Sequence, residues 1–326
     1  MRIAVTGAHG HVGVNLCKSL LSCGHEVNAL SHKNIKGLQG MNVRLVKGDV
    51  LDIFSLKKLL NDVEVVIHLA AKISITGDRD GQVAKINTYG TQNLVNQALD
   101  CKVRRFIHFS SIHAFQQNPL NHPLDETRPL VISDGFAYDR SKAAGERAVL
   151  DAINKGLDAV ILSPTAIIGP ADPQPSLTGN AILEIFNNQI PALVPGGYDW
   201  VDVRDIVSGT ISAIESGRTG EKYLLSGHWH SLMDLSQLIE VHSGRKTVKL
   251  VLPFWLARAG LPFITMYSKI TGAKPLYTSE SLTIIGEGNR QILNAKAIKE
   301  LNYHPRPLTE TIRDILVWFR ENGYIK

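Results

Sequence analysis

The hydrophobic positions of this chain fall into two alternating kinds of segment. Short, nearly continuous apolar runs are separated by longer stretches in which apolar residues recur with helical spacing. The runs lie at residues 2–6, 25–30, 43–46, 63–69, 105–109 and 157–162, and helices are expected around 14–21, 55–61, 82–99 and 138–155. Apolar strands that alternate with helices are typical of a parallel sheet buried on both faces. The pattern therefore predicts an α/β fold over residues 1–170, a Rossmann-type doubly wound parallel sheet with helices on both faces.

The pattern loosens after residue 170. Three prolines lie within residues 170–175, which is typical of a loop, and the rest of the chain mixes short helices with a strand at Lys222–Leu225. We expect residues 171–326 to form mainly a smaller, mixed α/β lobe that binds the substrate. That strand and a helix at 203–216 are expected to return to the first domain.

A glycine-rich turn follows the first strand and precedes the first helical stretch. In this order of strand, turn and helix, each glycine has a specific structural role. Gly7 permits a tight turn, Gly10 lets the backbone approach a pyrophosphate, and Gly13 lets helix and strand pack closely. The unpaired N–H groups and positive dipole end of the helix then face the phosphates. The turn predicts a dinucleotide site. His9 and His11 either add charge near the phosphates or are exposed turn residues.

The second strand ends at Ser31, His32 and Lys33. A site for NAD usually places an acid here, to bind the 2′-hydroxyl of the ribose. A hydroxyl followed by two basic or potentially basic side chains suits a 2′-phosphate instead. The sequence thus favours NADP(H) over NAD(H), although the two side chains also fit a role as mere loop residues.

The carboxyl ends of parallel strands meet at one edge of the sheet, where ligands bind. The glycine turn, Ala70, Ala71, Ser111 and Pro164 all follow predicted strands, so we expect them to converge on one crevice. Further cofactor contacts are assigned to neighbouring positions, namely Val12, Asp49, Val50, Leu69, Asn87, Ser110, Thr165 and Ile167.

Tyr138 is the only one of eight tyrosines with a lysine, Lys142, four residues later. Residues at this spacing lie on the same face of a helix. An ammonium beside a phenol favours the phenolate, so we expect the pKa of Tyr138 to lie below its usual value of ~10. Such a group exchanges a proton with a carbonyl or an alcohol near neutral pH. The bland alternative is a solvated surface pair.

Charge and composition narrow the choice of function. The net charge is +5, but the basic residues are scattered and never run beyond two, which argues against nucleic acid as a partner. Three cysteines without metal-like spacing predict reduced intracellular thiols and no metal site. The chain enters an apolar strand at once, and the apolar stretch 250–267 is broken by prolines, a glycine and an arginine. We therefore expect a cytoplasmic protein with no signal peptide and no membrane span.

The motifs together resemble those of the extended short-chain dehydrogenase/reductase family, and its dihydroflavonol-4-reductase-like branch in particular. The resemblance runs over essentially the whole chain and is carried by residues 6–13, 68–71, 87–91, 109–111, 164–170, 200–206 and 300–308, with Tyr138 and Lys142.

The resemblance implies a role for each residue of a catalytic set. Tyr138 would be the general acid/base, Lys142 would bind the nicotinamide ribose, and Ser111 would hydrogen-bond the substrate oxygen. Two departures from the family pattern bear on the reaction. Ile112–His113 replaces the Asp-Glu pair of dehydratases, which argues against sugar dehydration, and Ser163 replaces an arginine that many members carry, which weakens the case for a nucleotide-sugar substrate.

The predicted function is reduction of a ketone or aldehyde with NADP(H). The alternative is a nucleotide-sugar epimerase, and the least favoured reading is a non-catalytic regulator that senses a dinucleotide. A small carbonyl compound or a sugar is the expected substrate, and a homodimer is expected from the resemblance. Pocket-lining positions are Lys72, His113, Phe136, Tyr198 and Trp200.

Overall fold

The computed structural model describes residues 1–32, 35–271 and 277–326. Within them, seven parallel strands form a central sheet in the order β3-β2-β1-β4-β5-β6-β9. The strands are β1 (Arg2–Thr6), β2 (Glu26–Ser31), β3 (Arg44–Lys47), β4 (Val65–His68), β5 (Arg105–Phe109), β6 (Ala159–Pro164) and β9 (Lys222–Leu225). The strand order reverses between β1 and β4, and in such sheets ligands bind at the carboxyl ends beside this point. The predicted fold class is confirmed.

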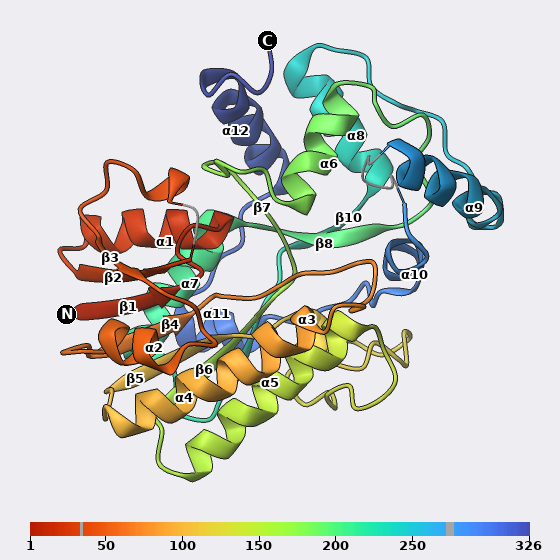
Figure 1. Cartoon of the computed structure of the whole chain (residues 1–326). Coiled ribbons are helices and arrows are strands. Elements are labelled where there is room, and N and C mark those ends of the chain that lie inside the picture. Colours follow the sequence, from red (N-terminus) through yellow and green to blue (C-terminus); the bar gives the residue numbers. More distant parts are fainter. Residues whose placement is uncertain (33–34, 272–276) are drawn as a thin grey trace.

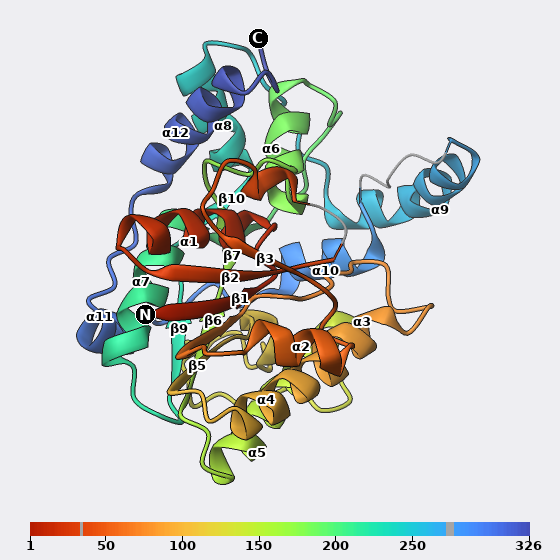
Figure 2. The same cartoon turned by 60° about the vertical axis from the view of Figure 1, so that its left-hand side comes forward.

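Helices cover both faces of the sheet (Figures 1 and 2). One face carries α1 (His11–Ser22), α7 (Val203–Ser216) and α11 (Ala295–Leu301), and the other carries α2 (Ile53–Leu59), α4 (Thr91–Asp100) and α5 (Ala137–Asn154). Each layer has its own apolar core. Leu16, Ile206 and Leu301 belong to the core on the first face, while Leu56, Leu94 and Val149 belong to that on the second.

A lobe stands over the carboxyl end of the sheet. Its three-stranded sheet has the order β10-β8-β7, and a third apolar core lies between that sheet and the helices around it. The strands are β7 (Ala166–Ile168), β8 (Gly197–Asp202) and β10 (His228–Ser231), and the helices are α6 (Leu177–Phe186), α8 (Leu232–Ser243), α9 (Phe254–Thr271), α10 (Ser279–Glu287) and α12 (Leu308–Glu321). The strand β9 and the helix α7 lie in the large sheet and its helical layer, although both come from the second half of the chain.

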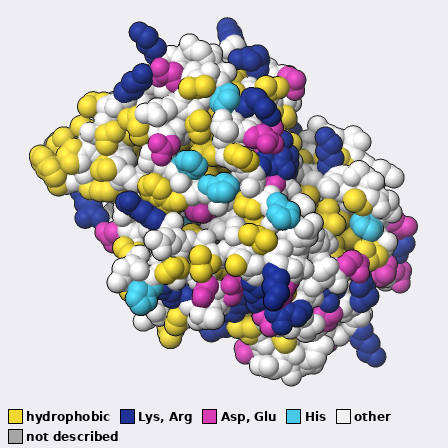
Figure 3. All heavy atoms as spheres, turned by 180° about the vertical axis from the view of Figure 1, so that it is seen from behind, with side chains coloured by type: hydrophobic (Ala, Val, Ile, Leu, Met, Phe, Trp, Pro, Cys, Tyr) yellow, Lys and Arg dark blue, Asp and Glu magenta, His cyan; other side chains and the backbone are white. Residues whose placement is uncertain are grey.

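Helix α9 projects from the lobe (Figure 2). It runs for 18 residues through Pro262, in the stretch whose prolines and glycine argued against a continuous span. Trp255 and Met266 are exposed on it, and apolar side chains gather over this projection when the molecule is seen from behind (Figure 3). Among the described residues, no helix combines the length and the apolarity that crossing a bilayer requires.

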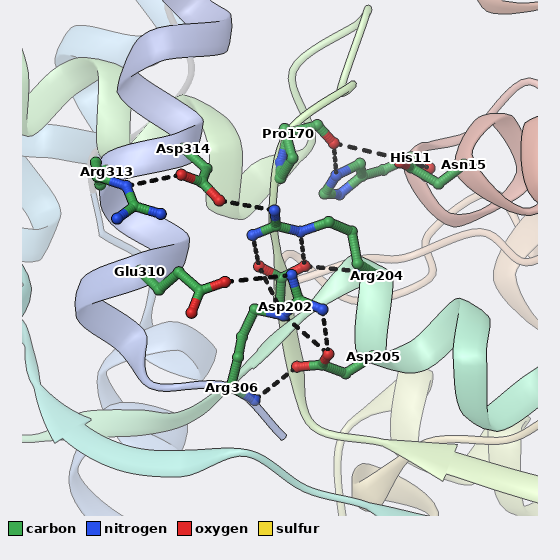
Figure 4. Close-up of polar contacts among 10 residues, drawn as sticks. All are labelled: His11, Asn15, Pro170, Asp202, Arg204, Asp205, Arg306, Glu310, Arg313 and Asp314. Atoms are coloured by element: carbon green, nitrogen blue, oxygen red, sulfur yellow. Dashed lines mark hydrogen bonds and ion pairs between the residues drawn. The ribbon is translucent and has the colours of Figure 1, made fainter. Parts of the chain in front are cut away.

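Ion pairs join the lobe helix α12 to α7 (Figure 4). Asp202 caps α7 by accepting a hydrogen bond from the Arg204 N–H, and its side chain has no exposed area. The Arg204 guanidinium lies 2.7 Å from Asp202 and 2.7 Å from Asp314 of α12. Arg306, just before α12, pairs with Asp205 of α7 at 2.8 Å. These contacts fix the lobe to the sheet domain on the side of the glycine turn.

The helix predicted at 82–99 is interrupted. Its first turn, α3 (Gln82–Ala84), leads into a π-helical turn at Lys85–Gly90 before α4 begins. A Cβ on Gly90 would lie 2.6 Å from the Val50 side chain, so glycine allows the wide turn to approach the end of β3 closely. Such π turns are frequently found at functional sites, and this one packs against α5, the helix that carries Tyr138 and Lys142.

Candidate active site

The three predicted catalytic residues come together at the end of β5 and the start of α5. The Ser111 hydroxyl lies beside the Tyr138 phenol and acts to lower its pKa. Ser111 also accepts a hydrogen bond from the His113 N–H at 3.2 Å, which fixes its oxygen at the start of a short 3₁₀ turn. Lys142 lies one helical turn beyond Tyr138 and donates to the Phe109 carbonyl at 2.5 Å. A buried hydroxyl and a buried amine thus flank a phenol that is partly exposed.

Burial dominates the protonation of this set. It raises the pKa of Tyr138 to about 12, against a lowering by the Ser111 hydrogen bond and with a further raising by Asp139. Burial also lowers the pKa of Lys142 to about 8, while Glu146 opposes that shift. The prediction that the Tyr138 pKa lies below its usual value is therefore wrong for the protein by itself. The lysine amine bonds to the Phe109 carbonyl, and the loss of hydration is the largest influence on the pKa of the phenol.

The glycine turn has the shape that a dinucleotide requires. Gly7 has φ +69°, and a Cβ there would lie 2.7 Å from the Ala70 N atom. A Cβ on Gly13 would lie 2.3 Å from the Gly7 carbonyl oxygen, so only glycine allows α1 to start this close to β1. Gly10 precedes α1, and the first turn of α1 has no side-chain cap. Its N–H groups are donors of the kind that binds a pyrophosphate at a helix N-terminus.

The two histidines of the turn differ in their surroundings. The His11 side chain is only 7% exposed and contacts the Pro170 carbonyl at 3.1 Å, which is also a partner of Asn15 (Figure 4). The alternative that His11 is an exposed turn residue is therefore wrong. It joins α1 to the loop after β7. His9 is partly buried, and burial together with His32 lowers its pKa, which disfavours an extra positive charge at the phosphates.

The end of β2 carries the groups that bear on the choice of dinucleotide. Ser31 is buried, whereas His32 is exposed and lies 3.7 Å from the Asp49 carboxylate after β3. Lys33 lies outside the described residues. Asp49 accepts a hydrogen bond from the Leu51 N–H at 2.9 Å, so its carboxylate is held at the same edge of the sheet.

A chain of buried hydrogen bonds ties the glycine turn to the π turn. The Ala70 N–H donates to the Thr6 hydroxyl, which lies 2.7 Å from His68 Nδ1. His68 Nε2 lies 2.9 Å from the Thr91 hydroxyl, which donates to the Asn87 carbonyl at 2.7 Å. Because Thr91 gives its proton to that carbonyl, His68 must carry its proton on Nε2 and accept from Thr6. Burial lowers the pKa of His68 to about 3, so the ring is neutral.

The Asn87 amide is bonded within the protein. It donates to the Ser141 hydroxyl at 2.9 Å and to the Lys72 carbonyl at 3.0 Å, and it accepts from the Lys72 N–H at 2.7 Å. A Cβ on Gly145 would lie 2.5 Å from the Asn87 carbonyl oxygen, so α5 packs directly on the π turn. Asn87, predicted as a cofactor contact, thus latches the loop after β4 to the helix that carries Tyr138.

Polar side chains that sequence reasoning missed lie beneath the catalytic set. Glu146, on α5, accepts a hydrogen bond from the Ser110 hydroxyl at 2.5 Å and pairs with Lys222 of β9 at 2.7 Å. The helical spacing of Tyr138, Lys142 and Glu146 was a signal in the sequence that would have found the carboxylate. The pairing with Lys222 depends on β9 lying next to β6, which no local pattern indicates.

The predicted pocket-lining residues divide into two groups. Near Tyr138, His113 lies with its ring edge-on at 6.2 Å and with its Nδ1 3.7 Å from Asp139, and Phe136 directly precedes α5. Trp200 is buried in the lobe core, where its indole N–H donates to the His230 carbonyl.

Further predicted contacts are held by the protein or buried in it. Lys72 pairs with Asp80 at 3.0 Å, and Tyr198 packs edge-on against Trp200 at 5.1 Å. Val50 is buried in the core beneath α2 and α4. Thr165, directly after Pro164 at the end of β6, donates to the Asp199 carboxylate at 2.7 Å. Leu69, Val12 and Ile167 are partly buried against the core around α1 and α7.

No group of three His, Cys, Asp or Glu side chains that could hold a metal ion occurs in the part of the chain that the structure describes.

Comparison with known proteins shows the family to which the chain belongs. Residues 3–226 match the model of the NAD dependent epimerase/dehydratase family. The chain is 32% identical to sterol demethylase protein B of Methylococcus capsulatus over the full length of both proteins. It is 30% identical to a putative dihydroflavonol 4-reductase of Synechocystis sp., which covers 99% of this chain and 95% of that protein. The crystal structure of gox2253 superimposes with a TM-score of 0.86 at 32% identity, over 99% of both chains.

Proposed function

Since the chain belongs to the NAD-dependent epimerase/dehydratase family and is an NAD(P)-dependent enzyme of the extended short-chain dehydrogenase/reductase type, we propose that it reduces a ketone or aldehyde with NADP(H). The observation that carries the proposal is the convergence of three side chains at the end of β5 and the start of α5: the Ser111 hydroxyl interacts with the Tyr138 phenol, and Lys142 lies one helical turn away. A phenol and a hydroxyl that lie side by side can both donate a hydrogen bond to a carbonyl oxygen bound between them.

The dinucleotide fits the residues at the β1–α1 turn. Gly7 and Gly13 leave no room for a Cβ, and Gly10 opens the first turn of α1 to a pyrophosphate. Bound there, the cofactor would supply the hydride that adds to the carbonyl carbon. We assign the Lys142 ammonium to the nicotinamide ribose, because its Nζ lies at the end of β5 within the same strand-end edge.

Proton transfer falls to Tyr138. A pKa of about 12 keeps its hydroxyl protonated at neutral pH. Reduction needs the protonated phenol, since the carbonyl oxygen gains a proton when the carbon gains hydride. The Ser111 hydroxyl holds that oxygen, and afterwards it can hydrogen-bond the phenolate. Proton transfer by a positioned group contributes roughly 10²–10⁴-fold to a rate.

The preference for NADP(H) rests on the end of β2. The basic side chain of His32 suits a 2′-phosphate, and its Nδ1 lies 3.7 Å from the Asp49 carboxylate at the same edge of the sheet. Fluorescence titration with NADPH and NADH tests the preference. Tighter binding of NADPH supports it, and tighter binding of NADH contradicts it.

The reductase proposal is tested with a panel of carbonyl compounds, by following the nicotinamide absorbance. Tyr138→Phe should reduce kcat about 10²–10⁴-fold while leaving NADPH binding intact. Unchanged activity in this variant would refute the role of Tyr138. The family also includes epimerases. Purified protein that retains NAD and causes no net change in absorbance with any carbonyl would favour that alternative.

We also propose that the enzyme is a homodimer, as the family resemblance suggests. Light scattering after size-exclusion chromatography tests this, since a mass near 35.8 kDa would identify a monomer.

A further inference from the structure

A buried carboxylate lies one helical turn beyond Lys142. Glu146 has no exposed area, although it lies on the helix that carries Tyr138 and Lys142. Carboxylates are almost never fully buried unless they are paired. A buried ion pair also contributes little net stability, because desolvation offsets the attraction between its charges. Stability alone therefore does not account for a charge at this position.

The partners of Glu146 hold it from two strands. Its Oε2 accepts from Ser110, the residue next to Ser111, at 2.5 Å. Its Oε1 lies 2.7 Å from Lys222 Nζ, whose ammonium also lies 5.3 Å from the centre of the Phe115 ring. The carboxylate thus links the end of β5, the helix α5 and the edge strand β9 directly beneath the catalytic set.

The charges around Lys142 give this link a chemical consequence. Glu146 raises the pKa of Lys142, against the larger lowering by burial. Two histidines also face the amine, His68 from β4 and His108 from β5, and Lys142 lowers the pKa of each. Burial keeps both rings neutral, so neither adds a positive charge that would repel the ammonium. Tyr138, on the same face of α5, is neutral as well.

We propose that Glu146, held by Lys222, is a positioning residue: it keeps Lys142 as an ammonium for the dinucleotide and fixes Ser110 beside Ser111. This rests on the proposed function, because it assumes that charged Lys142 contacts the cofactor. Glu146 itself does not touch the substrate. It acts through the lysine and through the strand end.

The test is the pH dependence of NADPH binding, which requires no knowledge of the substrate. Fluorescence titrations of the full chain from pH 6 to pH 10 should show affinity falling as Lys142 loses its proton. Glu146→Gln keeps the shape of the side chain and removes its charge, so this fall should move to lower pH by about one unit. Glu146→Asp keeps the charge further from Lys142 and should give a smaller shift in the same direction.

Control variants distinguish the positioning role of Glu146 from an effect on the stability of the fold and from a failure of the proposed role of Lys142. Asp158→Asn breaks the pair with Arg105 at the opposite end of the sheet, and should leave the pH midpoint unchanged. If both Glu146 variants keep the wild-type midpoint while their melting temperatures fall, the role is merely structural and the inference is overturned. If Glu146→Gln does not fold, the midpoint of Glu146→Asp decides in the same way. If Lys142→Met binds NADPH with the wild-type pH profile, the assumed role of Lys142 fails instead.

Discussion

Gly10→Ala separates dinucleotide binding from folding. Gly10 has φ −77° and ψ 172°, which alanine adopts without strain. The added Cβ would meet the Gly7 carbonyl oxygen at 3.4 Å, an ordinary contact. The free energy of unfolding should therefore change by less than about 1 kcal/mol, and the reduced freedom of the unfolded chain favours the variant. The new methyl group would instead stand at the start of α1, where we place the pyrophosphate.

The expected loss of affinity follows from the bonds at this helix end. A hydrogen bond to a charged group contributes about 1.5–3 kcal/mol, so the loss of one weakens binding about 10- to 100-fold. Gly13→Ala is the matched control, because its Cβ would lie 2.3 Å from the Gly7 carbonyl oxygen and α1 would have to shift. Both variants are measured by NADPH titration and thermal melting. Gly13→Ala should melt at lower temperature, and Gly10→Ala should lose affinity alone. Wild-type affinity in a folded Gly10→Ala protein would refute the placement of the dinucleotide.

Three further predictions concern buried polar groups. Burial lowers the pKa of Lys142 to about 8, below the value of ~10.4 in an unfolded chain, so the unfolded chain binds more protons between these pH values. The melting temperature of the protein without dinucleotide should therefore rise relative to that of Lys142→Met from pH 8 to pH 10. A constant difference between the two melting temperatures would contradict this. Arg204→Met leaves Asp202 without two hydrogen bonds and should lower the free energy of unfolding in urea by about 1.5–3 kcal/mol. Arg313→Met is the control, because it removes an exposed pair with Asp314 and should change the free energy of unfolding by less than about 1 kcal/mol. Equal effects would argue against a stabilising role of the Arg204 contacts shown in Figure 4. Thr91→Val removes the hydrogen-bond acceptor of His68 and should lower the free energy of unfolding by about 1–3 kcal/mol in the same assay. Thr88→Val is the control, because the Thr88 hydroxyl makes a longer hydrogen bond of 3.3 Å. A loss of stability no larger than that of the control would contradict the hydrogen-bond chain through His68.

The sheet could be predicted from the sequence because its strands are buried on both faces. Continuous apolar runs mark such strands, and the glycines after β1 mark the ligand edge through steric demands that are local to the turn. The π turn could not be predicted in this way. Its apolar positions continue the helical pattern, while the wide turn depends on Gly90 meeting Val50 and on the bonds of Asn87 to Ser141 and Lys72. These are contacts between segments far apart in the chain.

Trp200 illustrates a second limit. Trp200 was expected to line the substrate pocket, yet its indole bonds to the backbone of the neighbouring strand and its ring is buried in the lobe core. An aromatic side chain that fills a core and one that lines a pocket have the same sequence pattern. Alternation along a strand tells which face of the sheet a side chain lies on, but it does not tell whether protein or a ligand covers that face. The pairing of β8 with β10 places Trp200 in the lobe core, and that pairing joins residues about 30 positions apart in the sequence.

The Tyr138–Lys142 pair shows the same division between local pattern and fold at the level of chemistry. Spacing alone predicts correctly that the two side chains share a face of α5, but it predicts the wrong sign for the pKa of the phenol. The missing influences come from elsewhere in the chain: the loss of hydration around the phenol and the amine, the Phe109 carbonyl that accepts a hydrogen bond from the amine, and Glu146 with its partner on β9. In the protein these make Tyr138 a neutral proton donor and leave Lys142 close to its titration point. A negatively charged dinucleotide beside Lys142 would favour the ammonium, and the ammonium would in turn lower the pKa of Tyr138. Cofactor binding would then prepare the acid, so that proton transfer is coupled to the presence of the hydride donor.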